Sequence, residues 1–228
     1  MARHDWSAFC QLDSMHSHWK RPGWSPTTRA YYWMLTFDAA AFGEQLELCR
    51  QAIRHLPFDL IDDEGLHLTL GRVGPAHDIG QAAAERLAHR AQHRIPEAFD
   101  LKAAPLTASR GAARYSVAPW TPLLALHEHL AQATTATGLP PLKPTSHLRP
   151  HIGIGYCSQT LATRPVRNAL APLRKLPPVT VRVDSVDLVL LRREPGAYRW
   201  DTVHSLPLAP FIEKPRSGTG ENLSIPTS

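Results

Sequence analysis

The sequence contains few cysteines and no long apolar run. Its 228 residues include only 3 cysteines, Cys10, Cys49 and Cys157, which lie far apart and form no CxxC pair. This spacing argues against a disulfide scaffold and a cysteine metal site, and it favours a reducing compartment. No apolar stretch approaches the roughly 20 residues that cross a bilayer, and the first residues lack the apolar core of a signal peptide. The sequence therefore predicts a cytoplasmic protein without a membrane span.

Blocks of like charge and arginine-rich tails are also absent. The formal net charge is +5, and charged and hydrophobic residues make up 20% and 43% of the chain, as in an ordinary globular protein. Tight sequence-specific binding of duplex nucleic acid is therefore not indicated. The mild positive charge suits an anionic ligand better than a cationic one.

Residues 65–71 read Gly-Leu-His-Leu-Thr-Leu-Gly and alternate in polarity. In an extended strand, Leu66, Leu68 and Leu70 fall on one side, and His67 and Thr69 fall on the other. The leucine side can be buried. The opposite side then carries an imidazole and a hydroxyl group two residues apart.

A second stretch, residues 151–156, reads His-Ile-Gly-Ile-Gly-Tyr. Alternation predicts that Ile152, Ile154 and Tyr156 face one way and His151 the other. Two histidines on two similar strands can be brought together across a cleft.

The order of the remaining segments suggests a duplicated layout. Periodicity predicts helices near residues 42–56, 79–95, 119–133 and 166–173, and further strands near 31–37, 99–107, 113–118, 179–193 and 198–206. This order predicts an α+β fold with two pseudosymmetric lobes, each an antiparallel sheet covered by helices, around a central cleft. Residues 30–210 would form this bilobal domain, 1–29 an N-terminal arm, and 211–228 a mobile tail rich in Gly, Ser, Thr and Pro.

The two histidine stretches resemble the paired H-x-[ST]-x motifs of the 2H phosphoesterase superfamily, most closely its 2′-5′ RNA ligase or RNA 2′,3′-cyclic phosphodiesterase branch. The first motif, His67-Leu68-Thr69-Leu70, matches fully. The second, His151-Ile152-Gly153-Ile154, has glycine in place of the hydroxyl residue. The resemblance covers roughly residues 31–208. It implies hydrolysis of RNA 2′,3′-cyclic phosphate ends to 2′-phosphates, and the family name implies reversible 2′-5′ ligation as well. A monomer is expected.

Two histidines on opposite sides of a phosphorus atom suffice for this chemistry. One imidazole takes a proton from water and the other protonates the leaving oxygen, so the reaction requires no metal and no cofactor. The Thr69 hydroxyl can donate to a phosphate oxygen. The resemblance implies that His67 is the general acid and His151 the general base.

Gly153 is the main departure from the family pattern. Loss of one hydroxyl donor costs on the order of 10²-fold in rate unless another group replaces it. Glycine lets a phosphate approach the main chain closely, so the backbone N–H at 153 is one replacement. Arg149, two residues before His151, is a second, and Lys143 and Ser146 in the preceding loop are others.

Two other functions fit the same sequence. A catalytically weak protein could bind RNA ends or nucleotides on this fold, or the substrate could be a small cyclic phosphate metabolite. The His127-Glu128-His129 run does not favour a metal site, because residues two apart on a helix point in different directions. Four aromatic residues are candidates for stacking on a base, although each is more often a packing residue: Tyr115, Tyr156, Tyr198 and Trp200.

Overall fold

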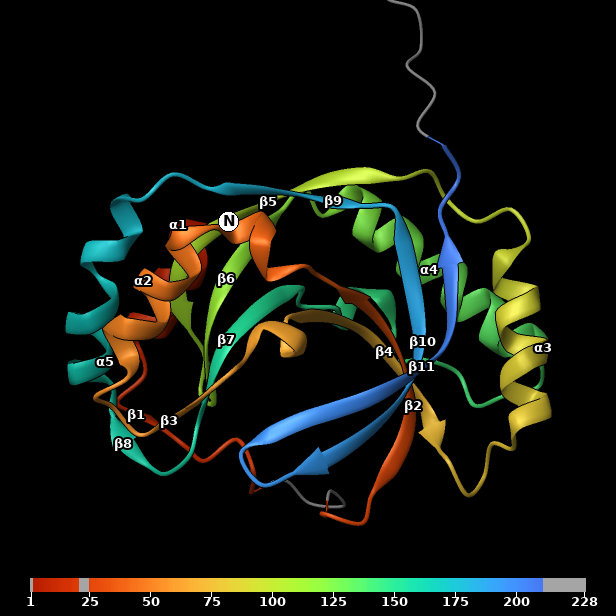
Figure 1. Ribbon diagram of the computed structural model, residues 1–228, viewed down its shortest axis with the longest axis horizontal. Helices are drawn as coiled ribbons and strands as arrows, with labels where there is room; N and C mark the ends of the chain where they lie inside the picture. Colours follow the sequence, from red (N-terminus) through yellow and green to blue (C-terminus); the bar gives the residue numbers. More distant parts are fainter. Residues whose placement is uncertain (1, 21–24, 211–228) are drawn as a thin grey trace, which may run out of the picture.

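Two antiparallel sheets form the centre of the protein (Figure 1). A computed structural model describes residues 2–20 and 25–210, and the tail predicted at 211–228 lies outside them. The five-stranded sheet has the order β3 (Phe58–Leu60), β7 (His151–Cys157), β6 (Ala112–Ala118), β5 (Phe99–Ala108) and β9 (Val179–Val183). The four-stranded sheet has the order β11 (Ala197–Pro207), β10 (Ser185–Glu194), β2 (Arg29–Thr36) and β4 (His67–Pro75). The predicted α+β class is confirmed.

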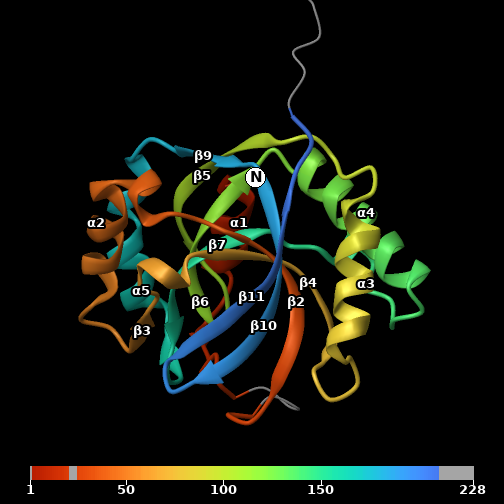
Figure 2. The same ribbon diagram turned by 45° about the vertical axis from the view of Figure 1, so that its right-hand side comes forward.

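Helices flank both sheets (Figure 2). α3 (Gln81–Gln92) and α4 (Thr121–Ala136) lie side by side against the four-stranded sheet, and α2 (Glu44–Ile53) packs on β7 and on α5 (Thr163–Leu170). Short 3-10 turns complete the described chain: η1 (Ala39–Phe42), η2 (Asp63–Gly65), η3 (Thr145–His147) and η4 (Pro172–Lys175). None of the helices in the described ranges is long and apolar enough to span a bilayer.

The lobes are not consecutive halves of the chain. The late hairpin β10–β11 is in the same sheet as the early strands β2 and β4, and its β10 pairs with β2. The earlier hairpin β5–β6 is in the same sheet as β7, and its β6 pairs with β7. The single strand predicted over residues 179–193 is wrong, because it breaks at Asp184 into β9 and β10, which belong to different sheets. Only one polar residue between two strand-forming runs marked this crossover. The sheet that contains the first histidine strand therefore ends in a hairpin from the end of the chain, and the second histidine strand pairs with β3 on one side and β6 on the other.

The alternation predicted for the first histidine strand is confirmed. On β4, Leu68 and Leu70 are buried in the main core, while Thr69 is exposed and His67 is partly buried. The pairing partner directly opposite His67 on β2 is Thr36. The polar side of β4 thus shares a face with the polar end of β2.

The second histidine strand departs from simple alternation. Its register against β6 shifts between Ala113 and Arg114, so that one extra residue of β7 is accommodated. This bulge moves Tyr156 onto the face that carries His151. The prediction that Tyr156 shares a face with Ile152 is therefore wrong, because a bulge inverts the alternation beyond it.

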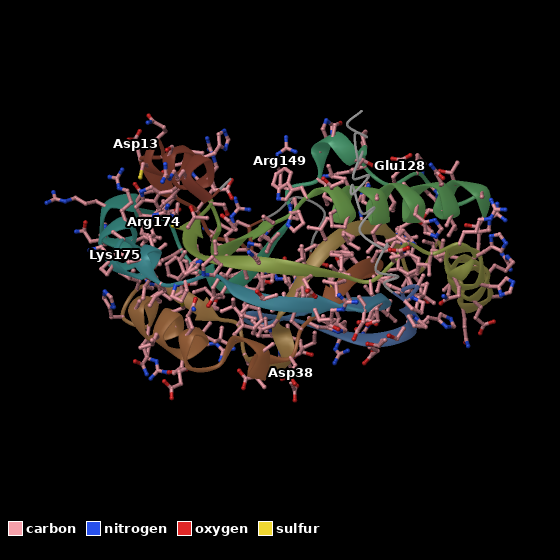
Figure 3. All side chains as sticks on the ribbon, turned by 90° about the horizontal axis from the view of Figure 1, so that it is seen from above. Asp13, Asp38, Glu128, Arg149, Arg174 and Lys175 are labelled. Carbon is pink, nitrogen blue, oxygen red and sulfur yellow. The ribbon has the colours of Figure 1, made fainter. Side chains whose placement is uncertain are left out.

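The N-terminal segment contains a helix and a short strand that its sequence periodicity did not reveal. α1 (Ala2–Cys10) packs on β5 and β6, with Phe9 buried, and β1 (Ser14–Met15) pairs with β8 (Leu161–Ala162). The Ser116 hydroxyl donates to Asp5 of α1 at 2.6 Å, and Ser116 is the residue directly opposite His151. α1 therefore covers part of the His151 face of the sheet, and α2 lies on the other face (Figure 3).

Leu68→Ala should lower the free energy of unfolding by about 2–5 kcal/mol, because it removes a fully buried side chain and leaves a cavity. Thr69→Ala, one residue along the same strand, should cost less than about 1 kcal/mol because its side chain is exposed. Urea unfolding of both variants measures the difference. Equal losses would contradict the assignment of the two faces of β4.

Candidate functional site

The His67 imidazole is held by the backbone immediately before its strand. Its Nδ1 lies 2.8 Å from the carbonyl oxygen of Gly65. Because a carbonyl only accepts, Nδ1 carries the hydrogen, and Nε2 of the neutral ring is the atom that can accept a proton. Burial lowers the pKa of His67, and the hydrogen bond to Gly65 opposes this effect. Burial therefore favours the neutral imidazole.

His151 is oriented in the same way. Its Nδ1 donates to the carbonyl oxygen of Arg149 at 2.8 Å, again two residues before the histidine. Each histidine is the first residue of its strand, and β4 and β7 approach within 8 Å between Cα atoms although they belong to different sheets. The structure thus places two identically anchored imidazoles on neighbouring strands.

An ion pair fixes the loop that precedes His67. Asp62 accepts from both terminal nitrogens of Arg199 on β11, with 3.0 Å between Nη1 and Oδ1. Hydrogen bonding from Arg199 lowers the pKa of Asp62, so the carboxylate stays charged. The pair ties β11 to the loop whose Gly65 carbonyl orients His67.

Ile61 lies between the two histidine strands. Its Cγ2 is 2.8 Å from the point where a Cβ on Gly65 would lie, and its Cδ1 is 2.8 Å from the equivalent point at Gly153. A methyl group therefore fills the space into which a side chain at 153 would project. The hydroxyl missing from the second motif is replaced at that point by an apolar group.

A small pocket opens beside His67. The lining comes from β3 and its following loop, β7, and the hairpin β10–β11, and consists of Leu60, Ile61, Asp62, Gly65, His67, Tyr156, Gly196, Ala197, Tyr198 and Arg199. The ring of Trp200 meets His67 edge to face at 5.2 Å between centroids. His151 does not line this pocket. The space beside His67 is therefore aromatic on one side and charged on the other.

Four aromatic rings close one end of this pocket. His18 and Trp19 of the N-terminal segment pack on Tyr156 and Tyr198, with centroid distances of 4.2–5.5 Å. The Trp19 indole N–H donates to Asp59 at 2.7 Å, and His18 Nε2 lies 3.0 Å from the Tyr198 hydroxyl. The N-terminal segment thereby joins the two sheets.

Of the other predicted phosphate ligands, Thr69 lies on the His67 face of its strand, whereas the Arg149 side chain points away. Thr69 is exposed on the His67 face of β4, as its predicted role requires. The Arg149 guanidinium donates to the carbonyl oxygens of Ser146 and Leu148, both at 2.8 Å, and points outward in Figure 3. Its backbone carbonyl, which orients His151, is the group that reaches the site.

The histidines of α4 have structural partners. His127 Nδ1 lies 2.8 Å from the Thr145 hydroxyl, which itself donates to Glu128 at 2.8 Å, so the cluster ties η3 to α4. His129 Nε2 donates to the carbonyl of Ala91. Across residues 2–20 and 25–210, no three His, Cys, Asp or Glu side chains come together as metal ligands.

Comparison with known proteins decides the family. A family model described as the 2′-5′ RNA ligase superfamily matches residues 40–195, more than half of the chain, and this span contains both histidine strands. The chain belongs to the 2′-5′ RNA ligase superfamily. The family predicted from the two motifs is thereby confirmed. A search of curated protein sequences finds no match.

Several solved structures share the fold of this 2′-5′ RNA ligase superfamily member. Escherichia coli LigT complexed with 3′-AMP has a TM-score of 0.61 and 14% identity, over 79% of this chain and 98% of that chain. A Thermus thermophilus protein has a TM-score of 0.55 and 15% identity, over 79% of this chain and 98% of that chain. A conserved Agrobacterium tumefaciens protein of unknown function has a TM-score of 0.51 and 12% identity, over 87% of this chain and 94% of that chain. At these identities the likeness concerns the fold alone.

Sequence reasoning missed several groups around the histidines of this superfamily member. The partners Asp62 and Arg199 lie 137 residues apart in the chain, and no local pattern relates them. Ile61 reads as an ordinary apolar residue in an acidic loop, and Asp5 belongs to a helix that was not predicted. The bulge in β7 has no sequence signal beyond Gly153 and Gly155.

His67 should make the protein less stable as the pH falls. Its pKa in the folded state lies below the unfolded value, so on acidification the unfolded chain binds the proton first, and stability is lost as the pH falls through about 6.5. His67→Gln should reduce the loss of unfolding free energy between about pH 7.5 and pH 5.5. Chemical denaturation at both values measures this, with His77→Gln, an exposed histidine beyond the end of β4, as control. An unchanged pH dependence in His67→Gln would contradict the effect of burial.

Proposed function

We propose that the protein hydrolyses 2′,3′-cyclic phosphates at RNA ends to 2′-phosphates, using His67 and His151 as an acid–base pair without a metal. The observation that carries this proposal is the shared anchoring of the two rings. Each Nδ1 hydrogen is committed to a carbonyl two residues earlier, at 2.8 Å in both cases. Both rings therefore present Nε2 as the reactive nitrogen, as a symmetric proton-transfer pair requires.

The proposed reaction is a single displacement at phosphorus. Nε2 of His151 removes a proton from a water molecule as its oxygen attacks the phosphorus atom. The bond from phosphorus to the 3′ oxygen breaks, and the Nε2 hydrogen of protonated His67 passes to that oxygen. The products are a 2′-phosphate and a 3′-hydroxyl group, and the Thr69 hydroxyl donates to a non-bridging oxygen on which charge builds. When the 5′-hydroxyl group of a second RNA attacks in place of water, the same step with the same acid and base forms a 2′-5′ linkage, and in its reversal the two histidines exchange roles.

The acid role of His67 depends on the charge of the substrate. Burial lowers its pKa and favours the neutral ring in the free protein. A bound phosphodiester carries one negative charge, and an anion in hydrogen-bond contact favours the imidazolium. Substrate binding and protonation of His67 are therefore linked, and each promotes the other.

The pocket beside His67 also bears on the substrate. Tyr156 and Tyr198 line it, and Trp200 contacts the His67 ring, so these aromatic side chains are candidates for stacking on a terminal base. The turn of the β10–β11 hairpin at Gly196 meets Asp59 of β3, which closes the pocket at that end. This closure favours a small cyclic phosphate as the second candidate substrate. The alternative is a nucleotide-binding protein of low activity. In that case the apolar Ile61 side chain beside Gly153 would take the place of a phosphate-binding donor and prevent turnover.

The first test is turnover of a short RNA ending in a 2′,3′-cyclic phosphate, with EDTA present. His67→Ala and His151→Ala should each lower kcat by about 10²–10⁴-fold, because each removes one proton-transfer step. His77→Ala should leave the rate unchanged. Binding of the RNA by the wild type without turnover would replace the hydrolase with the binding protein, and turnover of small cyclic phosphates alone would select the second candidate.

A substrate with a better leaving group distinguishes the general acid from the general base. A phosphodiester with a p-nitrophenolate leaving group needs no acid, since that anion departs without a proton. His67→Ala should then lose less than about tenfold, while His151→Ala keeps its full defect. A large defect of His67→Ala on the aryl substrate and a small one of His151→Ala would reverse the assignment.

A further inference from the structure

Arg114 on β6 faces the position where the second motif lacks its hydroxyl group. It is paired directly opposite Gly153 of β7, and the neighbouring residue on the same face, Ser116, is opposite His151. Directly opposed residues share one face of a sheet, and diagonal neighbours about 7–8 Å apart lie within reach of a long side chain. The arginine therefore projects from the His151 face beside the glycine.

The surroundings leave this arginine without a direct partner. In residues 2–20 and 25–210 its guanidinium makes no hydrogen bond within 3.5 Å and no ion pair within 4.0 Å, and its Nε is buried without an acceptor. Thr107, directly opposite Arg114 on β5, is 1% exposed, and its hydroxyl also lacks a partner. Adjacent buried polar groups without partners are rare in native proteins and indicate a missing ligand or water.

The described charge that acts on Arg114 is the Asp5 carboxylate of α1. It acts on Arg114 through space and opposes the lowering of the Arg114 pKa by burial, but it lies beyond ion-pair distance and accepts its hydrogen bond from Ser116. Asp5 therefore compensates part of the buried charge and leaves the donors of the guanidinium unused. An anion that carries its own oxygen acceptors would satisfy them.

We propose that Arg114 is the phosphate-binding residue that replaces the missing hydroxyl donor at Gly153. This assignment rests on the proposed function, because the anion is the phosphoryl group that His67 and His151 act on. The guanidinium donates to a non-bridging oxygen from the strand opposite Gly153, whose own side-chain position is filled by Ile61. The N-terminal helix then has a defined part in the site, since Asp5 tunes the strength with which Arg114 holds the anion.

Binding of inorganic phosphate, measured by calorimetry on the full chain, tests Arg114 without reference to turnover. Arg114→Gln should weaken phosphate binding at least about tenfold, because it removes the charged hydrogen bonds to the anion. Arg110→Gln removes an exposed arginine from the same hairpin and should have no effect. Equal phosphate affinity of Arg114→Gln and the wild type, or no binding by the wild type at millimolar phosphate, would overturn the proposal.

Asp5→Asn separates phosphate binding from a structural role. The asparagine keeps an acceptor for Ser116 and removes the competing charge, so phosphate affinity should rise. If Arg114 served only to neutralise Asp5, Asp5→Asn would leave phosphate affinity unchanged and lower the melting temperature.

Turnover of the cyclic phosphate by the same variants distinguishes the two proposals. Arg114→Gln should lower kcat/KM by about 10²-fold, the effect of removing one preplaced donor to a developing charge. A wild type that binds phosphate through Arg114 but hydrolyses no cyclic phosphate would refute the proposed function and leave the phosphate site standing. A wild type that turns over normally, with an unaffected Arg114→Gln variant, would refute only the role of Arg114.

Discussion

The contact between β4 and β7 is the constraint on which the rest of the structure depends. These strands belong to different sheets, yet their Cα atoms approach within 8 Å, and each begins with a histidine. Each sheet supplies one of the two histidines of the proposed site. Three features connect the two sheets around this contact: the strands exchanged between the halves of the chain, the hairpin β10–β11, and the N-terminal segment.

Backbone carbonyls complete the arrangement by orienting the two rings. The loop that supplies the Gly65 carbonyl is fixed by Asp62 and Arg199, so the direction of the His67 ring depends on an ion pair with β11. On the other side, the Arg149 carbonyl is fixed within the loop that η3 and α4 hold in place. Rings anchored through Nδ1 lose little freedom when substrate binds, and this is the usual advantage of preorganised sites.

The parts of the fold that follow from local patterns could be predicted from the sequence. The leucine face of β4, the buried stripe of α2 and the two histidine motifs each depend on spacing within one element, and the structure agrees with them. Those patterns were also sufficient to predict the family. Hydrogen-bond anchoring by the carbonyl two residues before each histidine was not predicted, because strand alternation describes side chains and not the loop backbone.

Features that depend on distant pairing could not be predicted. The exchange of hairpins between sheets, the pairing of Asp62 with Arg199, and the register of Arg114 against Gly153 are set by tertiary packing. The bulge in β7 inverted the prediction for Tyr156 because a single extra residue reverses every later side chain. Arg149 is close to Gly153 in sequence, whereas Arg114, 39 residues before Gly153 in the chain, is paired directly opposite it in the sheet.

The most direct test of the central claim is a crystal structure with a nucleoside 2′-monophosphate, the product of the proposed reaction. One phosphate group should have oxygen atoms within hydrogen-bond distance, about 2.6–3.2 Å, of Nε2 of both His67 and His151. A phosphate bound elsewhere, or in contact with only one of the two imidazoles, would contradict the two-histidine site.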